Sequence, residues 1–279
     1  MCNLIHANMK RIWKTRVFQI SAIIVAGLAL FQVLMNYRDY VVCGVTPYFD
    51  NALFAIAAVA VFPLAAFVSL YIGTEYSDGT LRNKIVVGQG RTAIYLANLI
   101  TSMIAGWLFL LIWSVAYLVP GIILMENGNP LFVYCLVYAG IFFMLAVFSA
   151  IFTWISMVLG KKAGSSVVCI LLTVLVLVSG VVIQSTLDQD EFYSPEYTVT
   201  ESGEIEYSGE LEPNPNYLPE GSTKRAVYEF LLDFTPGGQV MQLSAIRIDR
   251  IGYMMLYDVG WFVVMTGAGI LMFRRKSLK

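Results

Sequence analysis

The chain has 279 residues, of which 58% are hydrophobic and 13% are charged, and its mean hydropathy is +0.71. Soluble domains are about 45–50% apolar and about 25% charged. This composition excludes a soluble globular fold, because the chain has too few polar residues to cover a water-facing surface, and it predicts an integral membrane protein. The net charge of −1 carries no further information, but the distribution of charge along the chain does.

Residues 1–16 have the pattern of an amphipathic helix, with Ile5, Met9 and Ile12 on one face. We expect this helix to lie on the inner membrane surface, facing anionic lipid or a partner protein. Its basic residues would also act as a topology signal, and the two roles are compatible. The residues expected at the membrane surface are Lys10, Arg11, Trp13, Lys14 and Arg16.

The remaining apolar segments predict an all-α protein with six transmembrane helices. A spanning helix needs about 20 mostly apolar residues, and the run that starts at Val17 is too long for a signal-peptide core of about 7–15 residues. Pro63 is expected to kink the second span, and Pro120 with Gly121 to end the third. The predicted spans are 17–36, 52–72, 96–120, 131–157, 165–186 and 254–273.

Most of the 18 lysines and arginines fall in segments that six alternating spans place on one side of the membrane. These segments are the N-terminal arm, the 73–95 loop, the 158–164 loop and the tail from Arg274. The positive-inside rule therefore predicts that both termini are cytoplasmic. The expected location is the plasma membrane of a bacterial cell.

The opposite side would carry a large acidic loop, 187–253. Within it, "YTVTESGEIEYS" alternates in hydropathy and predicts a hairpin with a turn near 201–204, although a disordered acidic segment fits the composition nearly as well. Residues 224–250 predict two short amphipathic helices, joined by Pro236-Gly237-Gly238, that lie at or dip into the outer leaflet. The loop would either attract cationic substrates or form a solvated face.

Catalytic motifs are missing from the sequence. His6 is the only histidine, and neither a GxSxG motif nor a GxxxxGK[ST] phosphate loop is present. Asp258 is the only charged residue inside the predicted spans. It would be either a functional carboxylate or an interfacial residue in water. Cys43 and Cys135 are expected near the outer face, where they would either pair or, with Cys2 and Cys169, act as small apolar fillers.

A polar stretch, "GTEYSDGTLRNKIVVGQGR", follows the second span at residues 73–91. Ser77 or Asp78 is expected to cap a helix over 78–87, with Gly88 and Gly90 ending it and Thr92 capping the next helix. Such a helix would be about 12–15 Å long. It would be short and rigid, and braced between two spans.

These residues resemble the permease subunits of the type-2 family of ABC transporters. The inner loop of that family often reads E-aromatic-x-x-G-T-[LI]-[RK]-[NQ], and the chain matches it in order from Glu75 to Asn83. The resemblance implies that 78–87 is a coupling helix seated in a cleft of a separate ATP-binding subunit, with Glu75 at the membrane boundary, paired with the N-terminal arm or the partner. The residues it implies for docking are Glu75, Tyr76, Gly79, Thr80, Leu81, Arg82, Asn83, Lys84 and Ile85.

The resemblance also implies a single permease domain over 1–279 that pairs with a second permease chain, identical or related. The partner ATPase would bind ATP and Mg²⁺, so no cofactor and no catalytic site are expected in this chain, and no nucleic acid is expected as a partner. An unknown substrate, such as a peptide or an antibiotic, would be exported. The alternatives are an immunity or sensor protein that binds an extracellular peptide through the acidic loop, a secondary transporter or channel, and a membrane enzyme.

Overall fold

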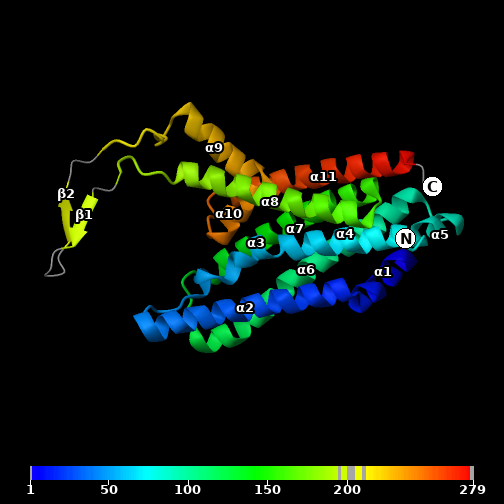
Figure 1. The fold of residues 1–279 in the computed structure, drawn as a ribbon, viewed down its shortest axis with the longest axis horizontal. Helices are drawn as coiled ribbons and strands as arrows, with labels where there is room; N and C mark the ends of the chain where they lie inside the picture. Colours follow the sequence, from blue (N-terminus) through cyan, green and yellow to red (C-terminus); the bar gives the residue numbers. More distant parts are fainter. Residues whose placement is uncertain (1, 194–195, 200–204, 209–211, 277–279) are drawn as a thin grey trace.

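A computed structural model describes residues 2–193, 196–199, 205–208 and 212–276 (Figure 1). The predicted turn over 201–204 and the last residues of the basic tail, 277–279, lie outside this part of the chain. Six helical segments within it are long and apolar enough to cross a membrane. They are α2 (Arg16–Cys43), α3 with α4 (Ile56–Val59 and Val61–Ser77), α6 (Arg91–Leu124), α7 (Leu131–Leu159), α8 (Lys162–Leu187) and α11 (Ile251–Arg275).

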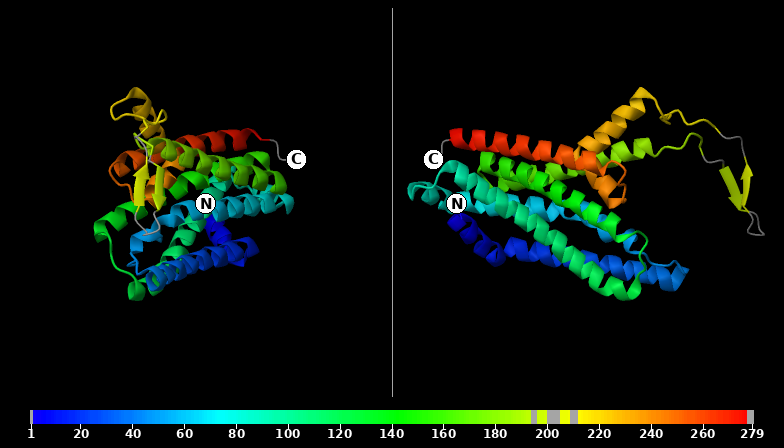
Figure 2. Two further views of the ribbon diagram at one scale, coloured as in Figure 1. Left: turned by 60° about the vertical axis from the view of Figure 1, so that its left-hand side comes forward. Right: turned by 180° about the vertical axis from the view of Figure 1, so that it is seen from behind.

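The long helices form one elongated bundle, in which α7 packs against α11, α4 against α8, and α2 against α6. Both ends of the described chain lie at one end of the bundle, together with α1 (Cys2–Lys14) and α5 (Thr80–Val86). We call this the terminal end. The opposite end carries α9 (Thr223–Phe234), α10 (Pro236–Ser244) and a two-stranded hairpin, and we call it the hairpin end (Figure 2).

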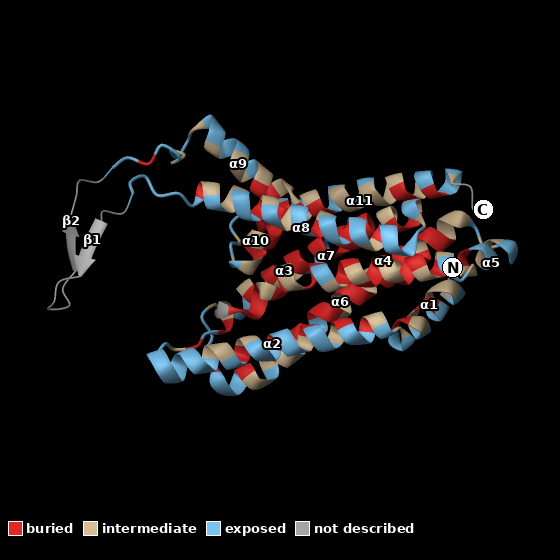
Figure 3. Ribbon diagram, in the orientation of Figure 1, coloured by how far each residue is buried: buried red, intermediate tan, exposed pale blue. Residues whose placement is uncertain are grey.

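Burial follows the bundle, with buried residues facing the helix contacts and exposed residues covering the outside (Figure 3). Phe18, Phe67 and Phe109 form an aromatic contact between α2, α4 and α6. The outer faces are also apolar, with Ile23 72% and Leu171 63% exposed. Apolar outer faces suit a helix bundle whose surroundings are lipid rather than water.

Proline acts differently in the second and third spanning segments. Pro63 breaks the second, as expected, because its ring excludes the carbonyl of Val59 and the chain turns at Ala60 between α3 and α4. The prediction that Pro120 ends the third helix is wrong. Pro120 lies inside α6, which runs on to Leu124. Proline lacks only its own N–H, so the bond to the carbonyl four residues earlier is lost, while the N–H groups of the residues after it can continue the helix.

The hairpin at the hairpin end has two strands, β1 (Glu196–Val199) and β2 (Ile205–Ser208). They pair antiparallel, with Val199 opposite Ile205. The hairpin is therefore the correct one of the two alternatives drawn from the alternating sequence.

The two short helices before α11 differ from the prediction in position. Pro236-Gly237-Gly238 forms the first turn of α10 rather than a linker. Thr235 caps this turn by accepting a 3.2 Å hydrogen bond from the Gly238 amide, and proline fits the first helical position because its missing N–H would be unpaired there. Most of α10 is buried, in contact with α3, α7, α8 and α9. It is a core element of the hairpin end.

Close backbone approach makes this insertion of α10 possible. Gly180 on α8 and Gly237 on α10 face each other, and a Cβ atom on Gly237 would overlap the carbonyl oxygen of Val176. Only glycine fits where two helix backbones come this close.

Candidate functional site

Glu75 lies in the last turn of α4, at the terminal end, and it is completely buried. A buried carboxylate needs opposite charge and hydrogen bonds, because moving it out of water is otherwise costly. Its partners come from three other helices. Arg11 of α1 and Lys84 of α5 both contact Oε1, at 2.7 and 2.6 Å, and the Asn98 amide of α6 donates to Oε2 at 2.9 Å.

Buried amides extend this ion cluster into α1 and α6. The Asn8 side chain donates to Asn98 Oδ1 at 3.0 Å and to Thr101 Oγ1 at 3.2 Å, and it accepts from Lys84 Nζ at 3.4 Å. The Arg11 guanidinium lies 4.2 Å from the centre of the Tyr71 ring and donates to the Tyr71 carbonyl. We call Asn8, Arg11, Glu75, Lys84, Asn98 and Thr101 the Glu75 cluster. It ties α1, α4, α5 and α6 together at the terminal end.

The turn before α5 is built by glycine rather than by a side-chain cap. Gly79 has φ 67° and precedes the helix, and no side chain caps it. Asp78 instead ends α4, which runs through Ser77. The predicted cap at Ser77 or Asp78 is therefore wrong, and α5 covers Thr80–Val86 rather than 78–87.

Glycines also delimit the C-terminal end of α5. Gly88, at φ 89°, follows the helix as expected. The predicted Thr92 cap of the next helix is wrong. α6 starts at Arg91, its N-cap residue is Gly90, and no side chain caps it.

The inner face of α5 is bound to the bundle. Thr80 donates a 3.0 Å hydrogen bond to the Glu75 carbonyl, Leu81 is 1% exposed, and Lys84 points to the Glu75 carboxylate. The predicted docking residues therefore differ in exposure. Glu75, Leu81 and Lys84 anchor the helix, and Arg82 and Asn83 are the exposed members. Those of intermediate burial are Tyr76, Gly79, Thr80 and Ile85.

Two valines at the end of α5 add to its outer face. Val86 and Val87 are 78% and 79% exposed, although they follow a helix that is otherwise well anchored. Sequence reasoning gave them no role. Their exposure beside Arg82 and Asn83 forms a small apolar and basic surface at the tip of the terminal end, which we call the α5 tip.

A second contact at the terminal end joins α4 to α7 and to the end of α11. Tyr76 donates a 2.6 Å hydrogen bond to the Met157 carbonyl, and Lys276 Nζ donates to the Tyr76 hydroxyl at 3.3 Å and to the same carbonyl at 3.1 Å. Burial lowers the pKa of the Lys276 ammonium. Arg91, the first residue of α6, donates to the Arg274 carbonyl at 3.0 Å. Tyr76 thus connects α4 to α7 and to the end of α11.

The residues predicted to lie at the membrane surface differ in exposure. Lys10, Trp13, Lys14 and Arg16 are exposed, whereas Arg11 points into the Glu75 cluster. Ile12 is fully buried, so α1 packs against the bundle along one face.

Asp258 of α11 is 2% exposed, so the interpretation of this residue as one in interfacial water is wrong. Cys43 and Cys135 are both free and exposed, so no disulfide joins them in this structure, whereas Cys169 is free and buried.

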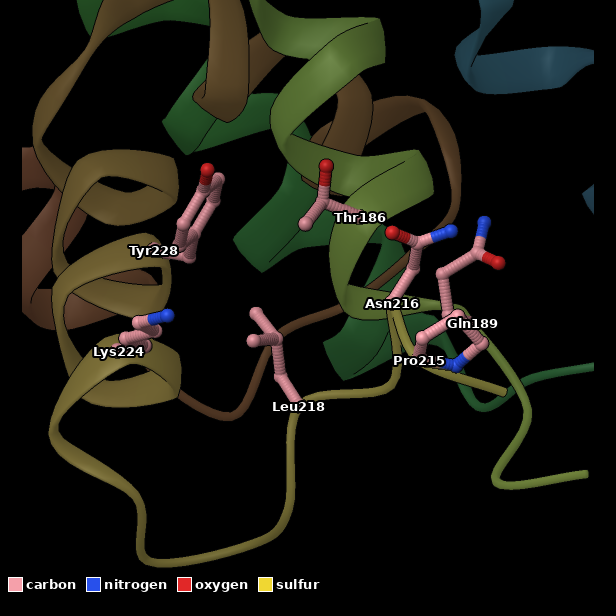
Figure 4. A pocket seen from close by; sticks show the side chains of 7 residues that line it. All are labelled: Thr186, Gln189, Pro215, Asn216, Leu218, Lys224 and Tyr228. Atoms are coloured by element: carbon pink, nitrogen blue, oxygen red, sulfur yellow. The ribbon is translucent and has the colours of Figure 1, made fainter. Parts of the chain in front are cut away.

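A pocket of about 560 Å³ lies at the hairpin end (Figure 4). Lys224 and Tyr228 of α9 face Thr186 at the end of α8 across it. The rest of the wall is Gln189, Pro215, Asn216 and Leu218. Its hydroxyls, amides and single ammonium can hydrogen-bond a polar ligand. The sequence gave no signal for this pocket, because its lining comes from three separate segments.

Comparison with known proteins found no match to the chain, either among protein-family models or among curated proteins. The candidate site therefore depends on its own geometry.

Sequence reasoning missed Asn8, Asn98 and Thr101. A signal was present for two of them, because Asn98 and Thr101 are three residues apart on one face of an apolar helix, and polar residues inside such helices usually have partners.

Proposed function

We propose that the chain is the permease subunit of an ATP-driven exporter of the type-2 ABC class, in which the α5 tip docks on a separate ATP-binding subunit. The observation that carries this proposal is the architecture of α5. Its outer face is exposed and partly apolar, while its inner face is bound through Glu75 to three other helices.

This arrangement would let a push on α5 reach the bundle. Breaking a buried ion pair by removing one partner costs about 3–5 kcal/mol, so α5 would move together with α1, α4 and α6 rather than peel away. The terminal end would face the cytoplasm, where the partner hydrolyses ATP, because the basic segments gather there. Two permease chains would enclose the path of the exported substrate.

A test is to purify the full-length chain from its native host and to identify an associated ATPase by its phosphate-loop sequence and by ATP hydrolysis in the complex. Val86→Asp and Val87→Asp should abolish the association, because they place a carboxylate in the docking surface. Val45→Asp is the matched control, since Val45 is an exposed valine (56%) at the hairpin end. The proposal fails if no ATPase is found with the unaltered chain, or if all three variants retain it.

A second candidate function is an immunity or sensor protein that binds an extracellular peptide. The pocket between α8, α9 and the 212–222 segment favours it. In that case Tyr228→Ala would abolish protection against the peptide, and Val86→Asp would leave protection unchanged. The exporter proposal requires that Val86→Asp abolish the activity.

A further inference from the structure

Asp258 is a buried carboxylate that is incompletely paired. Its Oδ1 atom has no hydrogen-bond partner within the described part of the chain. The Gln239 side chain of α10 lies within hydrogen-bonding reach of the carboxylate, and its amide nitrogen also donates to the carbonyls of Asp233 and Met254, at 2.9 and 3.3 Å. The Gln239 oxygen is unpaired as well. Asp258 Oδ1 and the Gln239 oxygen are thus two buried acceptors without a donor in the described part of the chain.

Within the described residues, the helices that pack around Asp258 supply no cation to it. Arg225 of α9, which also contacts α11, pairs with Glu229. α7 and α10 contain no lysine or arginine, and α6 has only Arg91, its first residue. Arg274 lies sixteen positions away on α11, which corresponds to about 24 Å. Arg250, at the start of α11, contacts Glu229 and Asp233 instead. An unpaired ionisable group inside a membrane helix is by default a functional group.

Asp258 lines a cavity of about 150 Å³ between α6, α7 and α11. Every other lining residue is apolar, and four of them are aromatic: Trp107, Phe142, Phe143 and Phe262. Trp107 stacks on Phe142 with ring centres 4.0 Å apart, and its indole N–H donates to the Phe142 carbonyl at 3.2 Å, so this wall is fixed in place. Phe142 and Phe143 are 41% and 37% exposed, which opens the cavity to the side of the bundle.

We propose that this cavity binds an amphiphilic organic cation, a primary ammonium attached to an aromatic or short aliphatic group. The ammonium would supply Asp258 with both the missing positive charge and an N–H donor for its Oδ1 atom. The aromatic walls would hold the apolar part and also attract the cation through their ring faces. A cavity of about 150 Å³ is large enough for a benzene ring. The cation enters laterally, from the apolar surroundings of the bundle.

The proposal goes beyond ATPase coupling, and its test uses no ATP, so the two proposals fail independently. Binding of benzylammonium to the full-length protein in nanodiscs of zwitterionic lipid is measured by equilibrium dialysis, with empty nanodiscs subtracted. Benzyl alcohol serves as the neutral probe, because it has the same ring and a hydrogen-bond donor without the charge. We expect the protein to bind benzylammonium more tightly than benzyl alcohol.

Asp258→Asn should weaken benzylammonium binding by about tenfold or more, since it removes the buried charge, and should leave benzyl alcohol binding unchanged. Asp233→Asn is the matched control, a nearly buried carboxylate that already has partners, and it should have no effect on either probe. Trp107→Leu keeps the carboxylate and should also weaken binding of the cation. Equal binding of the two probes, or full benzylammonium binding by Asp258→Asn or Trp107→Leu, overturns the proposal.

Discussion

Lys84 and Glu75 form a 2.6 Å ion pair between α5 and the last turn of α4, and the carboxylate in this pair is completely buried. Because Arg11 contacts the same oxygen, two cations depend on a single acceptor. The stability of the terminal end therefore depends on Glu75 more than on either of its basic partners.

Glu75→Gln should lower the free energy of unfolding by about 3 kcal/mol, since it leaves two cations without their counter-ion. Thermal unfolding of the protein in detergent measures this. Glu229→Gln is the control. Glu229 also pairs with two arginines, but its side chain is 33% exposed, and exposed pairs contribute about 0–1 kcal/mol. A similar decrease in the free energy of unfolding in the two variants would contradict the conclusion that the terminal end depends on Glu75.

Asn8→Ala should release α1 from α6. Asn8 is buried and donates to both Asn98 and Thr101, so its removal leaves polar groups unsatisfied at a cost of about 1–3 kcal/mol. Hydrogen exchange of the α1 amides should become faster, while exchange in α9 stays the same. Asn3→Ala, at an exposed position of the same helix, should change neither. Unaltered protection of α1 in Asn8→Ala would show that the apolar contacts of Ile12 suffice.

Gly237→Ala and Gly180→Ala should each destabilise the hairpin end by about 1–3 kcal/mol or more, because each new methyl group overlaps backbone atoms of the facing helix. Gly260→Ala, in the middle of α11 with open space around it, should instead be neutral or stabilise the protein by about 0.5–1 kcal/mol. Unfolding temperatures of the three variants check this. A stable Gly237→Ala protein would mean that the α10 backbone does not pack closely against α8.

Thiol labelling tests which end of the bundle faces the cytoplasm. In a chain whose only cysteine is the exposed Cys43 of the hairpin end, a membrane-impermeant maleimide should react with intact cells. In a chain whose only cysteine is introduced by Val87→Cys, the reagent should react only after permeabilisation. The opposite pattern would reverse the orientation and remove the α5 tip from reach of a cytoplasmic ATPase.

Several features of the fold could be predicted because they depend on local sequence. The six long helices follow from continuous apolar runs, the break before Pro63 follows from its ring, and the hairpin follows from alternation. The glycine that follows α5 was also predictable, because the left-handed conformation at Gly88 favours that residue.

The interior of the candidate site was harder to predict, because its contacts join distant segments. Pairing of Glu75 with the N-terminal arm was expected, but the position of Lys84 depends on the turn at Gly79, which brings α5 back against α4. The burial of Asp258 depends on how α10 enters the bundle. That entry depends in turn on a glycine contact between helices more than 50 positions apart in sequence, which hydropathy does not report.

The Glu75 cluster also constrains the order in which the protein is assembled. Chains emerge from the ribosome N-terminus first, yet Asn8 binds a residue that follows it by 93 positions. While the first two spans are being inserted, α1 has neither Asn98 nor Thr101 to bind, and the two donors to the Glu75 carboxylate that follow these spans, Lys84 and Asn98, are not yet in place. Docking of α1 must therefore wait until α6 has been synthesised, which makes the first helix of the chain one of the later ones to reach its final place.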